Sequence, residues 1–136
     1  MAREETGTDQ PKPRWFIDLD WLQQNNRSIS ALAQGYLCAK CRKQLQAEEK
    51  ELTEAELLTT IKDCCSHAPG FITSQSPILE SIFRLFLANG NQPLTLEKLG
   101  NQLSEQRGGE TSRTSEEFLS RLLKSDQFYG LRPAPD

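Results

Sequence analysis

The chain has 136 residues, of which 36% are hydrophobic and 26% charged, with 16 lysines and arginines against 19 aspartates and glutamates. The resulting net charge of -3 is spread evenly over both halves, so no overall electrostatic field favours nucleic acid. The longest apolar stretch, from Ile78 to Leu87, is interrupted by Glu80, Ser81 and Arg84, and the first residues lack the apolar core of a signal peptide. We therefore expect no membrane span and a cytoplasmic location.

The first part of the chain divides into a polar tail and an aromatic segment. Residues 1–13 are polar, contain two closely spaced prolines and show no periodicity, so we predict a disordered tail. From Trp15 to Leu22 the sequence becomes rich in apolar residues, including Trp15 and Trp21. We predict that these tryptophans anchor a small module at residues 14–69 or its contact with the rest of the chain. A partner-binding aromatic patch is the alternative.

Two helices are predicted in this first module. Ser28 or Ser30 is suited to cap a short helix through Ala31–Ala33. Further on, Thr53-Glu54-Ala55-Glu56 forms the sequence of a capping box, in which Thr53 and Glu56 each satisfy a backbone N–H of the other residue. The apolar face that follows runs through Leu57, Leu58, Ile61, Cys64 and Cys65, and we expect His67 and Pro69-Gly70 to end the helix.

All four cysteines and the single histidine fall into two clusters, Cys38-x2-Cys41 and Cys64-Cys65-x-His67. Two close groups of thiolate and imidazole ligands are typical of a tetrahedral zinc site that joins distant segments. Because Cys64 and His67 are three residues apart, on one helical face, we predict that Cys38, Cys41, Cys64 and His67 bind one structural Zn²⁺. Cys65 is the alternative to Cys64.

Other interpretations of these residues stay open at the level of sequence. Cys64 and Cys65 lie on an apolar stripe and could be core residues. Disulfides are disfavoured in a reducing compartment, and no strand-turn-helix pattern of a redox C-x-x-C motif precedes Cys38. Neighbouring cations are expected to offset the charge of the thiolates, with a phosphate contact as the second possibility: Lys40, Arg42 and Lys43.

A second module is predicted at residues 77–133, after a linker at residues 70–76. It begins with a strongly apolar helix from Pro77 to Leu87, which Asn89-Gly90 ends. Thr95 is predicted to cap a second helix, and Thr114 with Glu117 to form a capping box at the start of a third. We expect a short strand at Phe128–Leu131.

This order of elements, over residues 76–133, resembles the winged-helix branch of helix-turn-helix folds. The segment Leu87-Ala88-Asn89-Gly90-Asn91-Gln92-Pro93-Leu94-Thr95-Leu96-Glu97-Lys98-Leu99 is similar to the junction between the first two helices of such domains. The resemblance implies that the third helix, residues 115–124, enters the DNA major groove. Here that helix opens with Glu116 and Glu117, which departs from a DNA-binding surface. Many winged-helix modules act instead as protein-protein adaptors.

Together these patterns predict a mainly α fold, with a zinc-stapled helical module followed by a winged-helix-like domain. The leading hypothesis is a non-enzymatic zinc-binding adaptor that acts through protein-protein contacts in a transcription, replication or other nucleic-acid-associated assembly. The alternative is a DNA-binding transcriptional regulator that uses helix 115–124. No phosphate loop, paired carboxylate site or nucleophile motif is present. The candidate partner or nucleic-acid contacts are Trp15, Trp21, Arg113, Arg121, Lys124 and Arg132.

Overall fold

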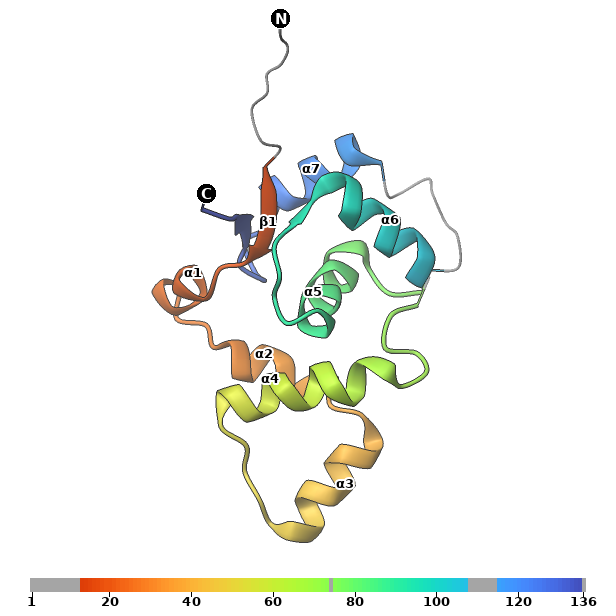
Figure 1. Ribbon diagram of the computed structural model, residues 1–136. Coiled ribbons are helices and arrows are strands. Elements are labelled where there is room, and N and C mark those ends of the chain that lie inside the picture. Colours follow the sequence, from red (N-terminus) through yellow and green to blue (C-terminus); the bar gives the residue numbers. More distant parts are fainter. Residues whose placement is uncertain (1–12, 74, 108–114, 136) are drawn as a thin grey trace, which may run out of the picture.

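The computed structural model describes residues 13–73, 75–107 and 115–135, and within them the protein is mainly helical with a small three-stranded antiparallel sheet (Figure 1). The elements are, in chain order, β1 (Arg14–Ile17), α1 (Leu19–Gln24), α2 (Ile29–Ala33), η1 (Gln34–Tyr36), α3 (Ala39–Glu48), α4 (Glu54–Asp63), η2 (Cys65–His67), α5 (Ile78–Ala88), β2 (Leu94–Thr95), α6 (Leu96–Gln106), α7 (Glu116–Ser125) and β3 (Leu131–Pro133). No helix in these ranges is long and apolar enough to cross a membrane.

The sheet joins the beginning of the described chain to its end. Strand β1 lies between β2 and β3 and is antiparallel to both, with Trp15 opposite Leu94 on one side and Pro133 on the other. Trp15 and Ile17 are buried, whereas Arg14, the first residue of β1, is exposed. The sheet therefore contains strands from both of the modules that the sequence predicts.

An asparagine side chain fastens β1 to the turn after α5. The Asn91 Nδ2 donates to the Ile17 carbonyl at 2.9 Å, and its Oδ1 accepts from the Ile17 N–H at 2.8 Å. The amide thus pairs with Ile17 as a backbone residue of a neighbouring strand would. Asn91 itself has a positive φ of 62°, a conformation that asparagine tolerates better than most residues.

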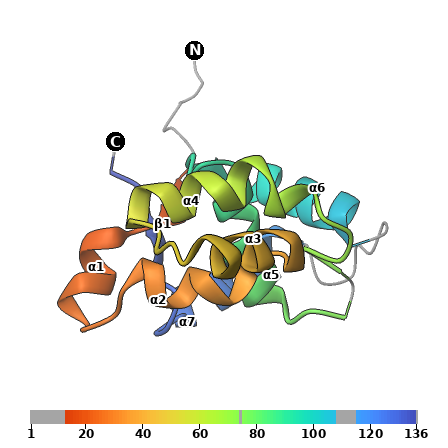
Figure 2. The ribbon, with the colours of Figure 1, turned by 90° about the horizontal axis from the view of Figure 1, so that it is seen from below.

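One continuous cluster of buried apolar side chains runs through the described residues, from Trp15 to Leu131. Helix α5 supplies much of it and packs against β1, α4 and α6, while α4 also packs against α2 (Figures 1 and 2). Helix α3 is different: it lies at the end of the molecule opposite the sheet and makes sparse contacts with the other described elements (Figure 1). In α3, Cys41 is the buried residue.

The helix starts agree in part with the predicted caps. The Thr53–Glu56 capping box is present at the start of α4, Ser28 caps α2, and Thr95 caps α6. The capping box predicted from Thr114 and Glu117 is wrong, because the N-cap of α7 is Ser115, whose Oγ accepts from the Phe118 N–H. Thr114 lies outside the described residues, as does the predicted tail except for Pro13.

The last strand begins later than predicted, at Leu131 instead of Phe128. The buried carboxylate of Asp126 accepts hydrogen bonds from the backbone N–H groups of Phe128, Tyr129 and Leu131. These bonds wrap residues 127–130 into a turn around the carboxylate, so the backbone becomes extended only after Gly130.

The segment predicted as a linker, residues 70–76, is bonded to two helices. Arg84 of α5 donates to the Phe71 carbonyl at 2.6 Å. The buried Arg107 donates to the carbonyls of Thr73, at 3.1 Å, and Ser76, at 2.5 Å. Charged donors of this kind make stronger hydrogen bonds than neutral ones, so Phe71, Thr73 and Ser76 are held against α5 and the residue that follows α6.

Candidate metal centre

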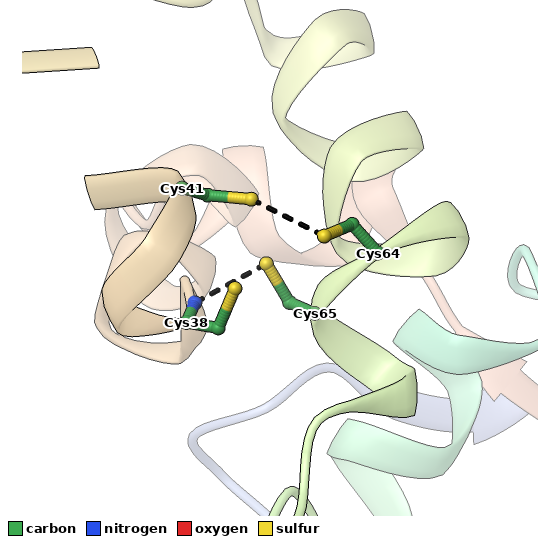
Figure 3. Close-up of side chains that lie close together, drawn as sticks. All are labelled: Cys38, Cys41, Cys64 and Cys65. Carbon is green, nitrogen blue, oxygen red and sulfur yellow. Dashed lines mark hydrogen bonds between the residues drawn. The ribbon is translucent and has the colours of Figure 1, made fainter. Parts of the chain in front are cut away.

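Four cysteine side chains converge between the start of α3 and the end of α4 (Figure 3). Cys38 precedes α3 and Cys41 lies in its first turn, while Cys64 ends α4 and Cys65 begins η2. Their Sγ atoms all lie within 4.8 Å of one another, and the Cys41 and Cys64 sulfurs are 3.5 Å apart. All four are free thiols, so none is bonded to another sulfur.

A break in the helix brings the two neighbouring cysteines to the same point. In a continuous α-helix, successive side chains project about 100° apart, so Cys64 and Cys65 could not both face one ion. Cys64 has φ −125° and ψ −62°, which ends α4, and the tighter η2 turn follows immediately. The Cys65 sulfur then reaches the start of α3, where it accepts from the Cys38 N–H at 3.2 Å.

The dimensions and chemistry of the cluster fit a tetrahedral soft-metal site. Zinc–sulfur bonds of about 2.3 Å place the sulfurs of a tetrahedral site about 3.8 Å apart, which agrees with the observed spread. Four thiolates are the ligand set of closed structural zinc sites. The cluster could therefore hold one metal ion with small movements of its side chains.

The surroundings give the four thiols unequal acidities. The Cys41 backbone N–H donates to Cys38 and lowers the Cys38 pKa to about 7. Burial raises the pKa of Cys41 and of Cys65 above the ordinary thiol value. A metal ion must displace protons from buried thiols, and its binding is consequently coupled to proton release.

The cluster is open to solvent on one side. A hollow of about 570 Å³ is lined by Cys38, Cys64 and Cys65, together with His67, Lys40 and Arg84. This hollow provides an entry path for an ion.

The three cations next to the cysteines of α3 differ in their contacts. Lys40 and Lys43 are exposed, and the Arg42 guanidinium donates to the carbonyls of Gly35 and Leu37, at 2.9 and 3.0 Å.

The structure brings Cys65 to the cluster, whereas the predicted ligand His67 lines the neighbouring hollow and is not among the converging ligand atoms. His67 is the exposed last residue of η2, and its ring nitrogens are not in the group of ligand atoms found among the described residues. The sequence indicates Cys65 as an alternative ligand to Cys64, because the two cysteines are adjacent in the second cluster. The periodicity of a continuous helix could not show that both would be used.

The other predicted contact residues are scattered. Trp15 is buried in β1, Lys124 is exposed, and Arg113 lies outside the described residues. Arg121 is 3.9 Å from Glu117 on the exposed face of α7. The pair that does meet is Trp21 and Arg132, whose guanidinium lies 4.5 Å from the indole ring.

A neighbouring cation–aromatic pair was not predicted. Arg27 lies 4.8 Å above the ring of Phe128, which is 47% exposed, and donates to the Gln127 carbonyl at 2.5 Å. Since these residues are about a hundred positions apart in the sequence, no local pattern could have paired them.

Comparison of the chain with protein-family models, curated proteins and solved structures gave no match.

Proposed function

We propose that the protein is a non-enzymatic adaptor in which one structural Zn²⁺, bound by Cys38, Cys41, Cys64 and Cys65, fixes α3 to the end of α4. The observation that carries the proposal is the convergence of four sulfur atoms within 4.8 Å. A site closed by four thiolates has no open position for water or substrate, which supports a structural role over a catalytic one.

The weak packing of α3 supports the same role for the metal. A ten-residue helix that buries Cys41 alone among its residues gains little from the hydrophobic effect. Bonds from a metal ion to both of its cysteines would supply the missing attachment. Three cations on the first turn and a half would offset the net negative charge of a zinc tetrathiolate: Lys40, Arg42 and Lys43.

The partner-binding part of the proposal concerns residues 77–133, which we propose to be winged-helix-like. Helices α5, α6 and α7 with the short strands β2 and β3 have the element order of such a domain. We propose an adaptor function instead of DNA binding because the exposed start of α7 carries Glu116 and Glu117, which would repel a phosphate backbone.

Metal content and ligand identity test the zinc site directly. Protein purified without added metal is expected to contain one zinc per chain by native mass spectrometry. Cys65→Ser should lose the metal, whereas His67→Asn should keep it, since its ring lies outside the cluster. Cobalt substitution should give the absorption bands of a tetrahedral tetrathiolate site. Metal retained in Cys65→Ser and lost in His67→Asn would overturn this ligand set.

DNA binding through helix 115–124 is tested by a mobility-shift assay at low salt, where even nonspecific binding is strongest. The adaptor proposal expects no shift. A shift that disappears on substitution of Arg121 and Lys124 would favour the regulator instead.

A further inference from the structure

Helix α4 has a second face that borders a groove. Its first face, with Leu57 and Ile61, is buried in the core. The second face consists of residues three or four apart and lines a groove of about 410 Å³: Ala55, Leu58, Thr59 and Lys62. The opposite wall is supplied by β1, α1, α2 and α5, through Ile17, Leu19, Ile29, Phe86 and Leu87.

The groove is apolar and its entrance is exposed. Leu19 is 41% exposed and is one of two large hydrophobic side chains that are exposed in the described part of the chain. Ala55 and Thr59 are exposed too, and their small side chains leave room beside the helix. An open apolar groove along a helix of this kind suits the apolar stripe of another helix.

The two ends of the groove carry opposite charges. A smaller hollow that shares Leu19 and Ile29 with the groove adds the carboxylates of Asp20 and Glu54. The same hollow contains Arg27, but its guanidinium is bonded to the Gln127 carbonyl and stacked on Phe128.

Lys62 lies at the other end of the groove. Lys62 is eight residues after Glu54, which corresponds to about 12 Å along a helix. Its aliphatic chain passes close to Gly90. Asp20, Glu54 and Lys62 have no ion-pair partner among the residues that the structure describes.

We propose that this groove binds one amphipathic helix of a partner protein, antiparallel to α4. Helices tend to carry acidic residues in the first turn and basic residues in the last, where these charges favour the helix dipole. In the antiparallel direction, the acidic start of such a helix meets Lys62 and its basic end meets Asp20 and Glu54. Aliphatic side chains at positions i, i+3 or i+4, and i+7 fill the groove over Leu19 and Leu58.

This inference rests on the proposed adaptor function and connects it to the metal. Cys64 and Cys65 directly follow the end of α4, so an ion bound there fixes the wall that carries Leu58 and Lys62. The metal thus stabilises the groove without lying in it.

The test uses a synthetic 16-residue helical peptide with glutamates in its first turn, a leucine stripe and lysines in its last turn. Titrated into metallated, isotope-labelled protein at low salt, it should shift the NMR signals of Leu19, Ala55, Leu58 and Lys62. Ala55→Arg, which fills the groove from an exposed helical position, should weaken binding by about tenfold or more. The matched control Ala47→Arg, on the exposed surface of α3, should bind within about twofold of the parent.

A nitroxide label at the peptide N-terminus reports the direction of binding. It should broaden the signals of Lys62 and Gly90 more than those of Asp20 and Glu54. The reverse pattern overturns the antiparallel arrangement.

Other results would overturn the groove itself. These are absence of shifts at millimolar peptide, shifts confined to other surfaces, or equal binding by the folded Ala55→Arg variant. A dimer in sedimentation analysis that Ala55→Arg dissociates would assign the groove to a second copy of the chain. Zinc content is measured on the same samples. Protein that contains zinc but does not bind the peptide overturns the groove alone, whereas protein that takes up no zinc yet binds the peptide supports the groove and overturns the zinc proposal.

Discussion

Helices α3 and α5 have nearly the same length but are held by different means. Helix α5 buries seven of its eleven residues, including Phe83 and Phe86, whereas α3 buries one of ten. Burial of apolar area contributes roughly 25 cal/mol per Å², so α5 is fixed by its own side chains. Helix α3 has almost none of this contribution. With the proposed metal bound, the two cysteines at its start would hold α3 in position, so this end of the molecule would depend on the ion.

Removal of the metal should produce the largest difference between α3 and α5. After chelation, the amides of α3 are expected to exchange hydrogen at the rates of an unfolded chain, while those of α5 stay protected. The effect is large because zinc binding to structural sites contributes about 10–16 kcal/mol. Hydrogen exchange with mass spectrometry measures both regions in one experiment. Protection of α3 that survives complete metal removal would contradict the comparison.

Gly130→Ala should destabilise the hydrophobic core, which holds α5 in place. Gly130 has φ +73°, and a Cβ at this position would lie 2.9 Å from Leu22 Cγ. The strained backbone and the overlap together are expected to cost about 3 kcal/mol, measured by urea unfolding. Gly35→Ala is the control, because nothing lies within 4 Å of its added Cβ. Equal stabilities of the two variants would show that neither the backbone strain nor the overlap with Leu22 destabilises the fold.

Asn91→Ala tests the attachment of the first strand. The substitution removes two hydrogen bonds to Ile17 and should lower the free energy of unfolding by about 1–3 kcal/mol. Asn101→Ala, at an exposed position in α6, should change it by less than about 0.5 kcal/mol. If both variants unfold at the same denaturant concentration, the Asn91 bonds make no net contribution.

Thr53→Ala probes the start of α4, which connects the two regions. Loss of the capping hydrogen bond from the Glu56 N–H should cost about 1 kcal/mol. Thermal unfolding of the metallated protein measures the loss. A variant as stable as the parent would show that the metal and the core already determine where α4 begins.

The smallest expected effect is a dependence on pH at the same cap. The Thr53 backbone N–H donates to Glu56 and lowers the Glu56 pKa below its ordinary value of 4.5. This contribution to stability is complete at neutral pH and is lost as the pH falls through the folded pKa. In Glu56→Gln, the amide oxygen can still accept the bond but does not titrate, so stability should fall less steeply below pH 4.5. Parallel pH profiles would assign the loss to other carboxylates.

The sequence predicted the features that depend on short-range patterns. The helical class, the box at Thr53, the cap at Thr95 and two groups of cysteines each follow from residues within a few positions of one another. The structure confirms the mainly helical class, both caps and the proximity of the cysteines. The ion itself stays a prediction.

The remaining features depend on contacts between distant residues. Nothing near Trp15 indicates that its strand pairs with β2 and β3, about 80 and 118 positions later. The use of both Cys64 and Cys65 depends on a helix break at Cys64, where no glycine or proline marks it. Asp126 is likewise recognisable as the centre of a turn only when its three N–H partners are placed.

The central place of β1 has a consequence for how the chain folds during synthesis. The ribosome makes this strand first, yet both of its neighbours come from later in the chain, and β3 is among the last described residues. The complete three-stranded sheet therefore cannot form until nearly all of the described chain has been made. Until then, Trp15 and Ile17 lack their neighbours in β3, which leaves one edge of a short apolar strand open to aggregation or to chaperones.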